Sequence, residues 1–147
     1  MEQEIGCTRV ALIVEDDKEV RALAVALLEE TDLRVVEASS AEEALQYLYY
    51  NAGDVAFLFS DVTLPCLMDG VDLARTVGLK WPWIRMVLTS AAPLEQNLDQ
   101  ALRRVRFMPK PWRALEVLME AEKAVEASHC ETAVSSTDTG ADRELRA

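Results

Sequence analysis

Short apolar runs alternate along the chain with stretches in which apolar residues recur every three or four positions. Nearly continuous apolar runs are typical of strands buried on both faces of a parallel sheet, and the longer period is typical of amphipathic helices. The runs predict strands at residues 10–14, 34–38, 55–61, 85–90 and 107–108. The periodic stretches predict helices at about residues 20–28, 40–51, 69–77, 93–102 and 115–128. This alternation predicts an α/β fold: a doubly wound, five-stranded parallel sheet with right-handed crossovers and helices on both faces.

Polar residues mark where several of these helices begin and end. Asp17 precedes the first helix and is predicted to be its N-cap. Ser40 and Glu43 have the spacing of a capping box, which predicts that the side chain of each accepts a hydrogen bond from the backbone of the other. The third helix is expected to end near Gly78 and the Trp81-Pro82 break.

The length of 147 residues predicts one domain with a full core. We expect it to span residues 9–128, after an N-terminal extension at residues 1–8. Residues 129–147 are rich in Ser, Thr, Asp and Gly and lack periodicity, so we expect a disordered C-terminal tail.

The charge and the apolar content restrict the classes of partner. The chain has 15 Lys and Arg against 26 Asp and Glu, a formal net charge of -11 that would repel a phosphate backbone and argues against direct nucleic-acid binding. No apolar run is long enough to span a bilayer, and no export signal precedes the first strand, so a cytoplasmic protein without membrane contact is expected. Cys7, Cys66 and Cys130 are odd in number and lack metal-type spacing, which favours reduced thiols.

Charged and hydroxyl residues follow the predicted strands at one end. Glu15 and Asp16 follow the first strand, Asp61 ends the third, Thr89 lies at the end of the fourth, and Lys110 follows the fifth. A lone acid after a strand is usually a helix N-cap or a loop residue. Because the carboxyl ends of parallel strands meet at one edge of the sheet, complementary groups on several strands instead favour a functional site.

These residue types suit phosphoryl transfer onto a carboxylate. Three carboxylates held together repel one another unless a cation relieves the repulsion. With no Cys or His in the cluster, oxygen ligands favour Mg²⁺ over Zn²⁺. Lys110 supplies a positive charge and Thr89 a hydroxyl donor for the same anion, and Asp61 supplies the nucleophile.

Five motifs resemble, in order, those of the receiver domains of two-component response regulators. The resemblance covers about residues 10–128 and is specific because the separate motifs follow one another in the family's order. The motifs are the acidic turn Val14-Glu15-Asp16-Asp17, the phosphoacceptor strand and loop Ser60-Asp61-Val62-Thr63-Leu64-Pro65, the helix start Met68-Asp69-Gly70, the switch hydroxyl segment Leu88-Thr89-Ser90, and the lysine segment Pro109-Lys110-Pro111.

The resemblance implies a role for each residue at the site. Asp61 would accept the phosphoryl group, and Asp16, Asp61 and the carbonyl of Thr63 would bind Mg²⁺, with Glu15 holding the metal largely through water. Thr89 and Lys110 would act on the phosphoryl group. The resemblance also implies a flavodoxin-like strand order of 2-1-3-4-5 and a cis peptide bond between Lys110 and Pro111.

The chain departs from the family pattern at three places. Cys66-Leu67 adds a residue to the loop after Asp61. Phe107 stands where the family's switch residue is often Tyr, and it is either a switch residue that moves by packing or a core residue. Trp112 stands where a smaller aromatic is usual, so its ring is expected close to the site.

The leading hypothesis is a stand-alone, single-domain response regulator that a histidine kinase or phosphotransfer protein phosphorylates. It would act on a partner protein or a second receiver through the face formed by the fourth helix, fifth strand and fifth helix, including Arg104 and Arg106, and would not be a classical turnover enzyme. One alternative is a Mg²⁺-dependent aspartyl-phosphate phosphatase, although haloacid-dehalogenase-type enzymes carry a second Asp where Thr63 stands. Another is a receiver-like interaction module that works without phosphorylation.

Overall fold

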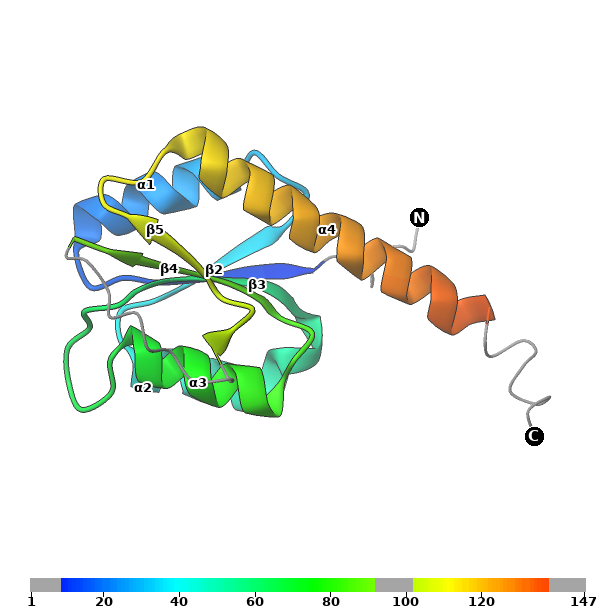
Figure 1. Cartoon of the computed structure of the whole chain (residues 1–147), viewed down its shortest axis with the longest axis horizontal. Helices are drawn as coiled ribbons and strands as arrows, with labels where there is room; N and C mark the ends of the chain where they lie inside the picture. The colour runs from blue at the N-terminus through cyan, green and yellow to red at the C-terminus, as the bar shows by residue number, and fades with distance from the viewer. Residues whose placement is uncertain (1–8, 92–101, 138–147) are drawn as a thin grey trace.

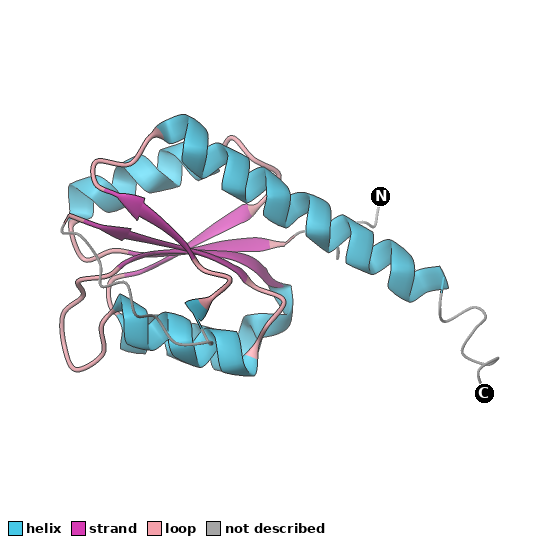
Figure 2. Ribbon diagram, in the orientation of Figure 1, coloured by secondary structure: helices cyan, strands magenta, loops and turns pink. Residues whose placement is uncertain are grey.

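The fold is a parallel sheet between two layers of helices (Figure 1, Figure 2). The structure, a computed structural model, describes residues 9–91 and 102–137. Within them the elements are β1 (Val10–Val14), α1 (Lys18–Leu28), β2 (Arg34–Ala38), α2 (Ala41–Asn51), the 3₁₀ turn η2 (Ala52–Asp54), β3 (Val55–Asp61), α3 (Gly70–Lys80), β4 (Arg85–Ser90), β5 (Arg106–Pro109) and α4 (Ala114–Thr137). All strand pairs are parallel and the order is β2-β1-β3-β4-β5, which confirms the predicted sheet.

Alternate residues of each central strand enter two separate cores. In β1, Leu12 packs with apolar residues of α2 and α3, whereas Ile13 packs with those of α1 and α4. Both residues are fully buried. The central strands are therefore apolar at nearly every position because helices cover both faces of the sheet.

The strand register aligns the carboxyl ends of the strands. Asp61 at the end of β3 is opposite Thr89 of β4, and Ser90 is opposite Pro109 of β5. Glu15 follows β1 directly, and its backbone N–H donates to the carbonyl of Ala38 at the end of β2. The polar residues that follow these strands are thus delivered to one edge of the sheet.

The starts of α1 and α2 match the predicted caps with one change. Asp17 caps α1 and accepts hydrogen bonds from the backbone N–H groups of the second and third residues that follow it. Ser40 caps α2 and accepts from the N–H of Glu43 at 3.1 Å. The carboxylate of Glu43 accepts instead from the backbone N–H and hydroxyl of Ser39. The capping box predicted a hydrogen bond from the backbone N–H of Ser40 to Glu43. That half of the prediction was wrong, because Glu43 accepts from Ser39, one residue earlier in the chain.

The limits of α3 differ from the prediction. Asp69 is the N-cap and forms a reciprocal capping box with Asp72. The helix then continues through Gly78 and ends at Lys80. Gly78 does not adopt a positive φ, and Trp81, which precedes Pro82, has left the helical region. The helix therefore ends at the predicted Trp81-Pro82 break, two residues beyond Gly78, because a proline restricts the residue that precedes it.

The last helix, α4, is longer than predicted and buries a partly different face. It continues to Thr137, so residues 129–137 of the expected disordered tail are helical. The predicted apolar stripe was Leu115, Leu118, Met119 and Val125. Val125 is buried as predicted, but Leu115 and Met119 are 67% and 52% exposed. The other buried positions include Val117 and Ala121, so residue hydrophobicity alone predicted only part of the buried face.

Three predictions fall on residues that the structure does not describe. These are the extension at residues 1–8, nearly all of the helix predicted at residues 93–102, and the tail at residues 138–147. Among the helices of residues 9–91 and 102–137, none combines the length and the apolar character that a membrane crossing requires.

Candidate functional site

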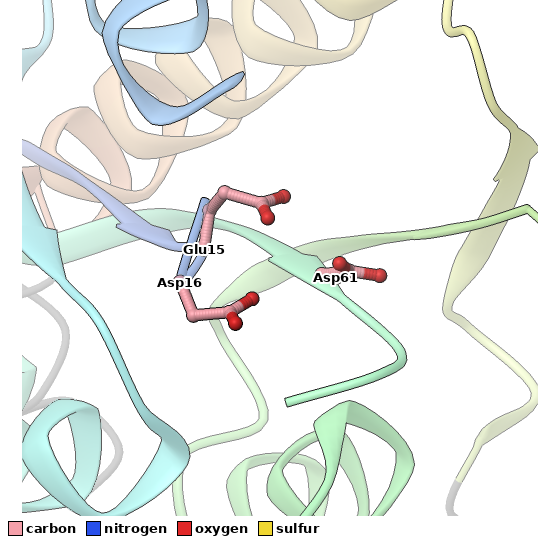
Figure 3. Close-up of side chains that lie close together, drawn as sticks. All are labelled: Glu15, Asp16 and Asp61. Carbon is pink, nitrogen blue, oxygen red and sulfur yellow. The ribbon is translucent and has the colours of Figure 1, made fainter. Parts of the chain in front are cut away.

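Three carboxylates lie together at the carboxyl edge of the sheet. Glu15 and Asp16 come from the turn between β1 and α1, and Asp61 comes from the end of β3 (Figure 3). One oxygen from each residue lies within 4.8 Å of the others. Glu15 and Asp61 are buried, whereas Asp16 is exposed. The predicted convergence of these acids is confirmed, and the cluster is open to solvent through Asp16.

Lys110 supplies the positive charge beside the acids. Its Nζ donates to Oδ2 of Asp61 at 2.8 Å and lies 3.6 Å from Oε1 of Glu15. Burial would lower the pKa of Lys110, but the hydrogen bond to Asp61 and the two negative charges outweigh burial, so the pKa is raised. The ammonium is therefore charged at neutral pH. The peptide bond from Lys110 to Pro111 is cis, as the family resemblance implied.

Glu15 is the acid whose environment opposes ionisation. Burial raises the pKa of its carboxyl group, and the charges of Asp61 and Asp16 raise it further. The backbone N–H of Asp17, which donates to Oε2 at 3.2 Å, and the charge of Lys110 act in the opposite direction. The net shift is upward, so this carboxylate gains from any cation placed among the three acids.

Both oxygens of Asp61 accept hydrogen bonds. Oδ2 accepts from Lys110, and Oδ1 accepts from the backbone N–H of Thr63 at 3.2 Å. Thr63 thus lies beside the acceptor in the loop after β3, where the resemblance places it. Thr89 is buried in the neighbouring strand opposite Asp61, and its carbonyl accepts from the N–H of Val62 at 2.8 Å. These contacts hold the carboxylate of Asp61 and the backbone that follows it.

Gly70 lets the start of α3 approach the backbone of Asp61. A Cβ atom at Gly70 would lie 2.0 Å from the carbonyl oxygen of Asp61 and 2.8 Å from its carbonyl carbon. The N–H of Gly70 donates to the carbonyl of Val62 at 2.7 Å. Only a residue without a side chain fits this contact. The sequence motif placed Gly70 at the start of a helix and did not reveal this role.

Glu42 holds the loop that connects β3 with α3. Its Oε2 accepts hydrogen bonds from the backbone N–H groups of Leu67 and Met68 at 3.2 and 3.1 Å. The preceding Cys66 has a φ of 74°, and Leu67 is almost fully exposed. The extra residue in this loop is therefore accommodated by a left-handed turn and anchored from α2. Twenty-five residues separate Glu42 from Leu67, and no sequence signal predicted their contact.

Arg21 ties the acidic turn to the neighbouring strand. Its Nη1 donates to the carbonyl of Glu15 at 2.7 Å, and its Nε donates to Glu37 of β2 at 3.0 Å. The sequence analysis assigned no role to Arg21. Its position one helical turn after Asp17 was the available signal, because such a side chain can reach back to the strand end.

The residues expected at the switch surface pack in different ways. Phe107 is half-buried and packs against the core on the α2 and α3 side, which leaves both of its predicted roles open. Trp112 makes an edge-to-face contact with Phe59, and the ring centroids are 5.4 Å apart. Phe59 lies two residues before Asp61 in β3. The side chain of Arg104 donates to the carbonyl of Pro82.

Arg106 belongs to an ion-pair cluster around Glu120, on the opposite end of the sheet from the acids. Glu120 is 2% exposed and accepts from Arg85 at 2.9 Å and Arg106 at 3.0 Å, and Lys123 lies 3.5 Å away. Burial would raise the pKa of Glu120, but the hydrogen bond from Arg85 and the charges of Arg85, Lys123 and Arg106 outweigh it and lower the pKa. Arg106 therefore has a structural role in addition to any contact with a partner.

The sequence of this chain matches a known protein family over the residues that form the site. The family model of the response regulator receiver domain matches residues 11–123. This chain belongs to the response regulator receiver family. The match includes the whole described site, from the acidic turn at Glu15 to Lys110. The receiver carries each residue that the motifs predicted, and the four charged side chains Glu15, Asp16, Asp61 and Lys110 lie together.

Two kinds of relative extend the comparison. The sensor kinase CckA of Brucella abortus (strain 2308) is 29% identical to this receiver over 126 residues, which are 84% of this chain and 13% of the length of that curated relative. The receiver domain of the hybrid histidine kinase CckA is 29% identical, with a TM-score of 0.65, and the match covers 78% of this chain and 97% of that one. The signal receiver domain of an HD domain-containing protein from Pseudomonas fluorescens Pf-5 is 25% identical, with a TM-score of 0.73, and covers 84% and 98%.

Proposed function

We propose that this receiver accepts a phosphoryl group on Asp61 in a Mg²⁺-dependent reaction and then presents an altered surface to a partner. The observation that carries the proposal is the hydrogen bond from Lys110 to Asp61 beside Glu15 and Asp16, in a chain of the receiver family. The phosphoryl donor would be a histidine kinase or a phosphotransfer protein. Action as a single-domain regulator and a cytoplasmic location remain predictions.

Asp61 has the environment of a positioned nucleophile. Its carboxylate is buried, and the bonds from Lys110 and Thr63 fix the direction of its two oxygens. In the transfer, a carboxylate oxygen forms a bond to phosphorus while the bond between phosphorus and the donor imidazole breaks, and the imidazole nitrogen keeps the electron pair. Lys110 can follow the negative charge from the carboxylate to the phosphoryl oxygens because its ammonium lies within 2.8 Å of the acceptor.

The donor set fits Mg²⁺. Glu15, Asp16 and Asp61 offer carboxylate oxygens that lie within 4.8 Å of one another, and this cluster contains neither Cys nor His. These residues and the carbonyl of Thr63 would hold the ion. When bound, Mg²⁺ would offset the charge of the acids and of the incoming phosphoryl group. Burial first, and then the charges of Asp61 and Asp16, raise the pKa of Glu15, so a cation held among the three acids would favour its ionised form.

Thr89 and Phe107 would carry the signal away from Asp61. Thr89 lies buried beside Asp61 on the adjacent strand, and Phe107 is opposite Leu88 on the next strand. A phosphoryl group that draws in the hydroxyl of Thr89 would leave room for Phe107 to repack. A partner must then bind the two states differently, and a difference of about 1–3 kcal/mol is typical of such coupling.

The test is intact-mass measurement after incubation with acetyl phosphate and Mg²⁺. The wild type should gain the mass of one phosphoryl group, and chelator should prevent the gain. Asp61→Asn should abolish it, whereas Asp54→Asn should not, because Asp54 is exposed in η2. A gain that persists in Asp61→Asn would contradict the proposal.

Assays of phosphate release and of partner binding on the same samples separate the two alternatives. Continuous release of inorganic phosphate with many turnovers per chain would indicate a phosphatase. A protein that binds its partner equally well before and after incubation, and never gains mass, would indicate a phosphorylation-independent module. The proposal predicts a single addition and a change in partner binding that follows it.

A further inference from the structure

A basic cavity lies at the amino edge of the sheet, opposite the acidic site. Its volume is about 390 Å³. The lining residues precede or begin the strands or belong to α4: Arg9, Ala56, Trp83, Ile84, Arg85, Arg104, Ala124 and Ala127. Neither the acidic cluster nor Lys110 contributes to this cavity, so the proposed phosphoryl transfer does not use it.

The second half of α4 contributes to the cavity. Figure 1 shows α4 continuing past the amino ends of the strands. Ala124 and Ala127 of this part of the helix line the cavity, and their small side chains leave space between the helix and the strands. A helix that ended with the sheet would leave this edge without a cover.

The cavity concentrates positive charge in a chain whose formal net charge is -11. Among the described residues, Arg9 and Arg104 donate to the backbone carbonyls of Gly53 and Pro82, which are neutral acceptors. Arg85 pairs with Glu120, but Glu120 also accepts from Arg106 and lies near Lys123. Glu120 is therefore shared among three cations, and Arg106 also lies 4.0 Å from Glu116. The described residues that line the cavity include three arginines and no acid.

Trp83 adds an aromatic surface to the arginines. Its indole N–H donates to the carbonyl of Ala52 at 3.2 Å, which fixes the ring, while 44% of the residue stays exposed. A fixed, partly exposed indole can stack on a flat ring of a ligand. Guanidinium groups suit phosphate because their planar forks make paired hydrogen bonds. The volume falls within the range of about 300–1,000 Å³ that is usual for small-ligand sites.

We propose that this arginine cavity binds a small organic phosphate with an aromatic ring, of the nucleoside diphosphate class. The phosphates would lie between Arg9 and Arg104, and the ring would lie against Trp83. We expect this ligand not to bind at the acidic edge, because Glu15, Asp16 and Asp61 repel anions in the absence of a metal ion.

Calorimetric titration with ADP in metal-free buffer with chelator tests the proposal. The wild type should bind ADP saturably. Arg9→Gln and Arg104→Gln should each weaken binding by about tenfold, which corresponds to about 1.4 kcal/mol. Arg103→Gln is the matched control, because Arg103 is exposed and does not line the cavity, and it should bind like the wild type. Arg85 is left unchanged because it pairs with buried Glu120.

Two further titrations separate the ring from the phosphates. Pyrophosphate should bind more weakly than ADP, and Trp83→Phe should reduce the difference between the two ligands. Asp61→Asn should bind ADP like the wild type, which would place the ligand away from the acidic site. Absence of saturable binding at millimolar ADP would overturn the proposal. Equal affinities of the Arg103→Gln and Arg104→Gln proteins would also overturn it.

Discussion

Replacement of Gly70 by Ala should disturb the phosphoacceptor through its backbone. The added Cβ would lie 2.0 Å from the carbonyl oxygen of Asp61 and 2.8 Å from the Cα of Val62. These are backbone atoms of the sheet and cannot rotate away, so the start of α3 must move. The movement strains or breaks the 2.7 Å hydrogen bond from Gly70 to Val62. Overpacking of this kind costs about 1–3 kcal/mol. The preference of a helix for Ala over Gly, about 1 kcal/mol, offsets only part of it.

Urea unfolding in chelator measures this loss of stability. Gly53→Ala is the matched control, because a Cβ atom at Gly53 would meet nothing within 4 Å. Its free energy of unfolding should change by no more than about 0.5 kcal/mol. The Gly70→Ala protein should also accept phosphate more slowly than the Gly53→Ala protein, because the carboxylate of Asp61 shifts with its backbone. Equal stability and equal phosphorylation of the two variants would refute the reasoning.

Three further predictions concern carboxylates. Glu120→Gln should lower the free energy of unfolding at pH 7 by roughly 1–3 kcal/mol. Because the folded state lowers the pKa of Glu120, the difference in stability between wild type and variant should shrink as pH falls through that lowered pKa. A difference that stays constant in urea unfolding across pH would contradict this prediction. Glu42→Ala should speed hydrogen exchange of the Leu67 and Met68 amides while Glu42→Gln, which keeps an acceptor oxygen, should not; unchanged protection in the alanine variant would count against the loop anchor. In chelator, Asp16→Asn should be at least as stable as the wild type, because one of three repelling charges is gone. Mg²⁺ at 100 times its dissociation constant should stabilise the wild type by about 2.7 kcal/mol, and the variant should lose most of this gain. A full gain for the variant in thermal melts would exclude Asp16 as a ligand.

The sheet and the acidic cluster could be predicted because they depend on local pattern and on a simple rule of topology. Buried strands are continuous apolar runs, and the carboxyl ends of parallel strands share one edge. The positions of Glu15, Asp61 and Lys110 then follow without knowledge of any side-chain contact. The cluster at this edge agrees with that argument.

Contacts between distant residues could not be predicted in the same way. The anchor from Glu42 to the loop depends on where α2 lies against the end of β3, and the need for Gly70 depends on a close approach of backbone to backbone. The buried face of α4 was partly misassigned because Leu115 is more apolar than Ala121, whereas the available space admits the smaller residue. Packing geometry decides these features, and hydrophobicity alone does not encode it.

Site mapping of the acyl phosphate tests the central claim most directly. Borohydride reduces an aspartyl phosphate to homoserine, so the modified residue can be identified by peptide sequencing after incubation with acetyl phosphate and Mg²⁺. The account predicts homoserine at position 61 and unmodified Asp16, because Asp61 is the acid that Lys110 contacts at 2.8 Å. Homoserine at position 16 or elsewhere, with Asp61 intact, would contradict the account.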